Sequence, residues 1–117
     1  MPNPLNLTSL ELLERLVSFD TVSDKSNLAL IGFVREYLDS HNISYVVQPN
    51  ARGDKAAIYA TMGPMIDGGV VLSGHTDVVP VAGQAWTTDP FVLRSEGTRL
   101  YGRGACDMKG FDACLLY

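Results

Sequence analysis

The chain has 117 residues, 46% hydrophobic and 19% charged, which suits one globular domain with a modest core. A net charge of −4, with lysines and arginines scattered singly, argues against a nucleic-acid or anionic membrane surface. No apolar stretch approaches the ~20 residues of a membrane span, and the start lacks the basic and apolar blocks of a secretory signal. Two cysteines do not form a disulfide framework, so we expect a cytoplasmic protein.

Two helices are predicted in the first forty residues. The first begins after Thr8, because Thr8 and Glu11 have the spacing of a capping box and leucines recur behind them at helical period. The polar stretch 20–27 separates it from a second helix. That helix starts at Leu28 and ends near His41.

Three β-strands are predicted next, at residues 43–48, 56–62 and 70–73. The third, with the sequence VVLS, is short and apolar except at its end. Such a run is typical of a strand that is buried on both faces of a sheet.

A hairpin and a helix complete the predicted elements. Residues 91–102 read as a small hairpin with its turn at Gly97, and the helix starts at Lys109 or Gly110. Two helices, then strands, then another helix indicate the α/β class, a partial sheet with flanking helices.

His75 and Asp77 directly follow the predicted strand at 70–73. Open α/β sheets bind ligands at the carboxyl ends of their strands, and alternation along an extended chain places these two side chains on one side. An imidazole is a common zinc ligand, and Asp77 is placed to support it as a hydrogen-bond partner. The short motif alone fits a second interpretation equally well, in which His75 caps a turn and Asp77 binds the backbone.

A second cluster, YGRGACDMKG, spans residues 101–110. Three glycines in ten residues indicate tight turns or close approach to another group. Asp107 lies between this stretch and the start of the last helix, from where its carboxylate can project into the same cleft as His75. A carboxylate so placed can bridge two metal ions, which in two-metal hydrolases lie ~3.5–4 Å apart and activate water.

The segments SGHTDVVPV, DPF and LYGRGACDMKG closely resemble the zinc-dependent amidohydrolase family of acetylornithine deacetylase, succinyl-diaminopimelate desuccinylase, aminoacylase and carboxypeptidase G2. The resemblance covers essentially the whole chain and is clearest over residues 70–111. It implies that His75 binds one metal, that Asp107 bridges both, and that Asp77 is the catalytic-site carboxylate supporting the histidine. It also implies a cis peptide bond between Asp107 and Met108.

The resemblance further implies what the protein does. The expected reaction is metal-dependent hydrolysis of the amide bond of an N-acyl amino acid, most like the acetylornithine deacetylase step of arginine biosynthesis. The expected cofactor is zinc, two ions per full site, with cobalt or manganese also suited to a nitrogen and oxygen site. The expected partner is a small-molecule substrate, and the full-length protein is expected to be a homodimer.

The family's other catalytic parts come later in its sequence: a Glu-Glu pair that includes the general base, a third acidic ligand, a distal histidine and a lid domain with the dimer contact. We therefore expect residues 1–117 to be the N-terminal fragment of a di-zinc exopeptidase-like catalytic domain, without the lid and dimerisation domain and inactive alone. The alternatives are a non-catalytic metal-binding or interaction module, or a related desuccinylase, aminoacylase or carboxypeptidase. A nucleotide site is weakly supported, because the glycine cluster lacks the spacing of a phosphate loop.

Several other side chains are given structural roles. His41 is expected at a helix C-terminus, Cys106 in packing, and Trp86 in the packing of its loop. Arg103 is expected to be a solvated turn residue, with orientation of an acidic group as the alternative. Lys109 is expected at the surface, with pairing to an acid as the alternative.

Overall fold

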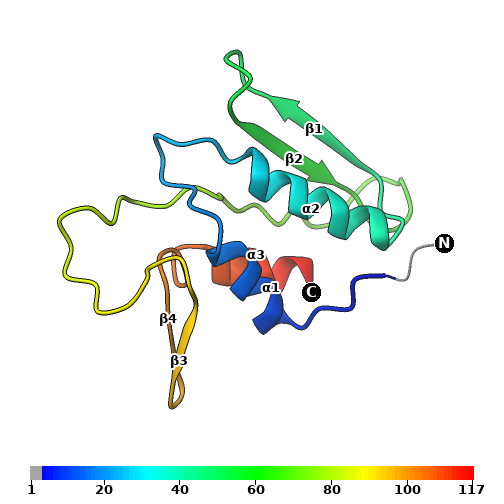
Figure 1. Ribbon diagram of the computed structural model, residues 1–117. Coiled ribbons are helices and arrows are strands. Elements are labelled where there is room, and N and C mark those ends of the chain that lie inside the picture. Colours follow the sequence, from blue (N-terminus) through cyan, green and yellow to red (C-terminus); the bar gives the residue numbers. More distant parts are fainter. Residues whose placement is uncertain (1–3) are drawn as a thin grey trace.

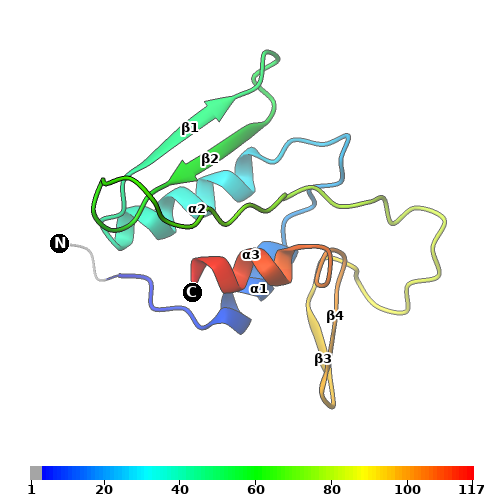
Figure 2. The same ribbon diagram turned by 180° about the vertical axis from the view of Figure 1, so that it is seen from behind.

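The computed structural model describes residues 4–117 and confirms a mixed α/β fold, with three helices and two small antiparallel sheets. Figures 1 and 2 show α2 beneath the β1–β2 hairpin and α1 beside α3. The β3–β4 hairpin projects away from these helices. The elements in chain order are α1 (Ser9–Val17), α2 (Leu28–Ser40), β1 (Tyr45–Pro49), β2 (Ala56–Ala60), β3 (Arg94–Glu96), β4 (Arg99–Tyr101) and α3 (Lys109–Leu116).

The first helix begins where the capping pattern predicts. The Glu11 amide donates to the Thr8 hydroxyl at 3.2 Å, and the Thr8 amide donates to the Glu11 carboxylate at 2.8 Å. These reciprocal bonds satisfy two backbone donors that a helix start otherwise leaves without partners.

None of the helices in residues 4–117 has the length and apolar character that a membrane crossing requires.

Both sheets are two-stranded hairpins. In the first, Tyr45 pairs with Ala60 and Pro49 with Ala56, and the Asn50 side chain accepts hydrogen bonds within the connecting turn. The second hairpin turns at Gly97, whose φ of 58° lies in the left-handed region that glycine adopts without steric cost. The predicted hairpin at 91–102 is thus confirmed, with shorter strands.

The core lies between the helices. Apolar side chains of α1 and α2 recur at helical spacing and belong to one buried cluster, which Ala113 of α3 and Ala56 of β2 complete. Figures 1 and 2 both show α3 packed along α1. The core residues contributed by the first two helices are Leu12, Leu13, Leu16, Val17, Leu30, Ile31, Phe33, Val34, Tyr37 and Leu38.

One side chain connects three parts of the fold. The Asn27 amide nitrogen donates to the Ala56 carbonyl at 2.9 Å, and the Asn27 side-chain oxygen accepts from the Ala56 amide at 2.9 Å. The same amide nitrogen also donates to the Thr76 hydroxyl at 3.1 Å. The start of α2, the start of β2 and the segment at residue 76 are therefore fixed to one another.

The predicted strand at 70–73 is wrong for this structure. Its residues lie outside every strand, and the side chains of Val70, Val71 and Leu72 are 60% to 86% exposed. A strand buried on both faces needs neighbouring strands that take its backbone hydrogen bonds and helices that cover it. Within residues 4–117, no strand pairs with this segment, which Figures 1 and 2 show as an extended stretch between α2 and the α1–α3 pair.

We predict that Leu12→Ala lowers the free energy of unfolding by about 2 to 5 kcal/mol, because Leu12 is fully buried and its truncation leaves a cavity. The matched control is Leu10→Ala on the same helix. Leu10 is half exposed, so its truncation changes stability by less than about 0.5 kcal/mol. Urea denaturation of the three proteins measures the difference, and equal midpoints for the two variants would contradict this account of the core.

Candidate metal centre

His75 and Asp107 meet in the folded chain although 32 positions separate them. The Nε2 atom of His75 lies 3.0 Å from Oδ1 of Asp107. On the other side of the ring, Nδ1 lies 3.0 Å from the Asp77 carbonyl oxygen and 3.1 Å from Asp77 Oδ1. The three residues that the motifs single out are therefore in contact, with the imidazole between two aspartates.

The segment that carries His75 is held by a short connection to the loop after α1. Val78 and Val22 form an isolated parallel bridge, in which the Val78 amide donates to the Thr21 carbonyl at 3.0 Å. The Ser23 hydroxyl donates to Asp77 Oδ2 at 2.7 Å. Asp77 thus places one carboxylate oxygen on Ser23 and the other beside His75.

Asp107 precedes α3 in a tight loop. The peptide bond between Asp107 and Met108 is cis, as the family resemblance implies. Gly104 has a φ of 81°, and a Cβ atom there would lie 2.5 Å from a methyl group of Val78. Glycine at 104 therefore lets the loop that carries Asp107 approach the segment that carries His75.

The structure corrects two expectations for this loop. Lys109 is fully buried rather than at the surface, and its ammonium group donates to the Phe19 carbonyl at 2.8 Å. Lys109 starts α3, which packs along α1, and its side chain reaches the Phe19 carbonyl just beyond the end of α1. Cys106 is exposed rather than packed.

The surroundings of Asp77, His75 and Lys109 shift the pKa values of these groups in different directions. The Ser23 hydrogen bond, with a smaller contribution from His75, lowers the pKa of Asp77. Burial acts to lower the pKa of His75, but the hydrogen bond that the ring makes to the Asp107 carboxylate and its contacts with Asp77 outweigh burial and raise that pKa. Burial lowers the pKa of Lys109 to about 8.

Asp112 is an acidic neighbour of this centre that the sequence analysis misses. Its carboxylate lies against Gly74, where an added Cβ would meet Asp112 Oδ1 at 2.0 Å, and its Oδ2 atom is buried without a hydrogen-bond partner. Burial raises the pKa of Asp112 to about 6, although the nearby charges of His75 and Lys109 act in the opposite direction. The sequence contains one signal that could have revealed Asp112. It lies three residues after Lys109, a spacing that places both side chains on one side of a helix.

The donor set suits a divalent transition metal. An imidazole nitrogen and a carboxylate oxygen face each other from exposed side chains, 48% exposed for His75 and 86% for Asp107. Zinc takes this combination of ligands, as do cobalt and manganese. Within residues 4–117, however, no cluster of three or more histidine, cysteine, aspartate or glutamate side chains has the geometry of a metal site. The contacting pair therefore supplies part of a ligand set.

His41 lies away from this centre. Its Nδ1 atom is 2.9 Å from the Tyr37 carbonyl and 3.0 Å from the Ser40 hydroxyl, and its ring packs against the Tyr37 ring at a tilt of 44°. The expected position of His41 at the C-terminus of α2 is confirmed.

Comparison with known proteins shows which sequences this chain is similar to. Residues 71–117 match the model of peptidase family M20/M25/M40. Over 93% of its length, the chain is 39% identical to the acetylornithine deacetylase of Proteus mirabilis, and over 92% it is 36% identical to that of Photorhabdus laumondii. The acetylornithine deacetylase of Buchnera aphidicola subsp. Schizaphis graminum is 34% identical over 92% of the chain.

The resemblance predicted from the motifs is therefore confirmed. The chain is similar to peptidase family M20/M25/M40 over residues 71–117, and to proteins named acetylornithine deacetylase over nearly its whole length. It spans about 30% of the length of these relatives.

We predict that Asp112→Asn makes stability less dependent on pH. The folded-state pKa of about 6 lies above the ordinary value of 3.8, so the stability that protonated Asp112 contributes is fully present below about pH 4 and is lost as pH rises through 6. Above pH 7 the free energy of unfolding of the variant should exceed that of the wild type by about 1 to 2 kcal/mol, because the substitution removes a partly buried charge without a hydrogen-bond partner.

Urea denaturation at pH 4, 6 and 7.5, in the presence of a metal chelator, measures this difference in the free energy of unfolding. Asp67→Asn is the matched control, because Asp67 lies in an exposed loop and the same change should leave the pH profile intact. Identical profiles for wild type and Asp112→Asn would show that Asp112 carries no such penalty.

Proposed function

We propose that this chain supplies the first metal ligands of a hydrolase that cleaves the amide bond of N-acyl amino acids, as the name acetylornithine deacetylase describes for its relatives. The observation that carries the proposal is the 3.0 Å contact between His75 Nε2 and Asp107 Oδ1. Two residue types that bind zinc come together from motifs far apart in the sequence, at a solvent-accessible place.

The proposed roles follow from the contacts of each side chain. With its proton on Nδ1, the His75 ring donates to Asp77 and presents the lone pair of Nε2 on the side of Asp107. Asp77, itself held by Ser23, fixes this tautomer and makes the imidazole a stronger ligand. On this proposal Asp107 would supply the carboxylate that holds both metal ions.

Zinc, or cobalt in its place, fits this donor set. When bound, the metal supplies Lewis-acid polarisation of the acyl carbonyl and activation of water. The residues of this chain would hold the metal and orient its ligands. His75 and Asp107 would bind the metal, and Asp77, together with Ser23, would fix the orientation of the imidazole ring. A catalytic zinc site takes three protein ligands, so other groups must complete the set.

We also propose that residues 1–117 form the first part of a catalytic domain. Support comes from the extent of the similarity, which covers nearly all of this chain and about 30% of each relative. The general base, the remaining ligands and the lid domain with its dimer contact would then belong to the part of the relatives that this chain does not span. On this proposal the 117 residues bind metal weakly and do not turn over substrate, and the whole protein is a cytoplasmic homodimer in arginine biosynthesis.

A second candidate function is a non-catalytic module that binds a metal or another protein. The exposed apolar segment favours it, because Val70, Val71 and Leu72 together with Met65 and Ile66 present hydrophobic surface to solvent. The coding sequence beyond residue 117 discriminates the two. A downstream Glu-Glu pair and histidine support the hydrolase, and a stop codon supports the module.

We predict that the 117-residue protein binds zinc weakly and that His75→Ala weakens this binding at least tenfold, because the variant removes one of two contacting ligands. Asp107→Asn should weaken it similarly, and Asp77→Asn should weaken it by about tenfold through the orientation of the ring. Isothermal titration calorimetry with zinc measures the affinities.

His41→Ala is the matched control, because it removes the other histidine of the chain at a position where the ring caps a helix. Its zinc affinity should equal that of the wild type. Equal affinities for wild type and His75→Ala would remove the basis of the proposed function.

A further inference from the structure

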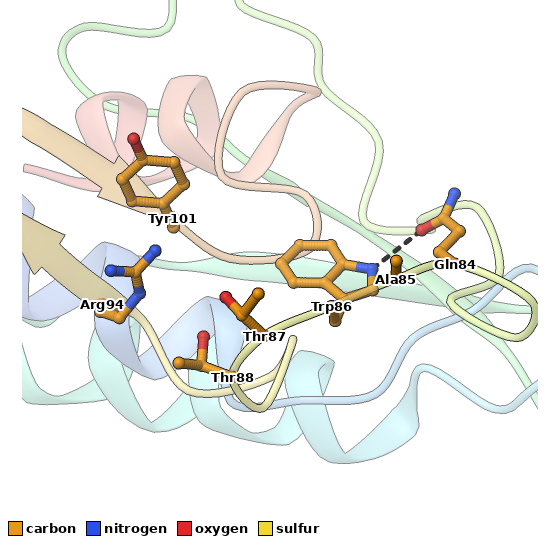
Figure 3. A pocket seen from close by; sticks show the side chains of 7 residues that line it. All are labelled: Gln84, Ala85, Trp86, Thr87, Thr88, Arg94 and Tyr101. Carbon is orange, nitrogen blue, oxygen red and sulfur yellow. Dashed lines mark hydrogen bonds between the residues drawn. The ribbon is translucent and has the colours of Figure 1, made fainter.

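A separate pocket of about 260 Å³ lies between the loop at 84–88 and the β3–β4 hairpin. Figure 3 shows its walls: the indole of Trp86, the guanidinium of Arg94 and the ring of Tyr101, with the hydroxyl groups of Thr87 and Thr88 between them. None of its seven lining residues has a part in the proposed metal centre, and none is acidic.

The Trp86 wall is fixed in orientation. Its indole N–H donates to the Gln84 side-chain oxygen at 2.9 Å, and the guanidinium of Arg103 donates to the same oxygen. The Arg103 guanidinium also lies over the indole ring, 5.2 Å from its centroid. The indole N–H is thus already satisfied, so the surface that Trp86 offers to a ligand is apolar.

The hairpin supplies the charge of the pocket. Arg94 and Tyr101 are partners across the hairpin, and the guanidinium lies 4.5 Å from the centre of the tyrosine ring. This stacking holds the long Arg94 side chain in place, which lowers the entropy cost of binding with it. Glu96 pairs with one amino group of the guanidinium from the solvent side, where its own side chain is exposed.

The local charge also favours an anion. The stretch 84–103 holds three arginines against two acidic residues, in a chain whose net charge is −4. Arginine presents a planar set of donors that matches a carboxylate, and threonine hydroxyls can donate further hydrogen bonds. The pocket volume of about 260 Å³ leaves room for a small organic acid.

We propose that this pocket binds the carboxylate of a small organic acid, with the carboxylate on the Arg94 guanidinium and the apolar part of the ligand against Trp86 and Tyr101. The site is built without His75, Asp77 or Asp107, so the proposal does not rest on the proposed hydrolase function.

The chain offers its own probe for this proposal. Trp86 is the only tryptophan, so the intrinsic tryptophan fluorescence of the 117-residue protein reports on this pocket alone. Titration with N-acetylglycine should change the fluorescence with a saturating curve. N-acetylglycinamide, which has the same shape without the charge, should not, and free N-acetyltryptophanamide controls for collisional quenching.

Three variants separate the carboxylate contact from general charge effects. Arg94→Gln should weaken N-acetylglycine binding about tenfold or more, because it removes the charge-assisted hydrogen bonds. Glu96→Gln should strengthen binding about two- to fivefold, because the competing carboxylate is removed from an exposed ion pair. Arg52→Gln changes net charge equally at an exposed turn and should leave affinity within about twofold.

The proposal is overturned if N-acetylglycine and its amide act alike, or if Arg94→Gln binds as the wild type does. Should circular dichroism show that Arg94→Gln fails to fold, Glu96→Gln decides, and an unchanged or weaker affinity overturns the proposal. His75→Ala should leave the fluorescence titration unchanged while it weakens zinc binding, so this proposal and the proposed function can fail independently.

Discussion

The bonds between residues 21–23 and 76–78 determine where the candidate centre lies. The segment before them is an extended stretch without a strand partner among the described residues, and the chain after them runs into loops. The single bridge from Val22 to Val78 and the bond from Ser23 to Asp77 therefore fix this part of the chain against the helical core. His75, two residues before Asp77, takes its position from this connection.

Elements that depend on local chemistry were predictable. The capping box of α1, the apolar spacing of both long helices and the glycine turn of the second hairpin each follow from interactions over a few residues. The proximity of His75 and Asp107 was predictable in a different way, from two motifs in the order that a known family has. Neither periodicity nor composition brings these two residues together.

Features that depend on distant partners were not predictable. The run at 70–73 has the composition of a buried strand, yet a strand exists only where another strand takes its hydrogen bonds. Lys109 reads as a surface residue until α3 is placed against α1, and Asp112 shows no special character until its contact with Gly74 is known. The pocket at Trp86 likewise needs the hairpin to be packed beside its loop.

The two-sided contact of Asn27 has a consequence for motion. Its amide group bonds with both backbone groups of Ala56 and with the hydroxyl of Thr76, the residue next to His75. A fluctuation that separates the first hairpin from α2 must break both bonds to Ala56, and these come from the same planar group that also holds Thr76. Strand β2 and the segment that carries the imidazole of His75 are thereby anchored to one side chain, so that loss of this anchor would loosen both.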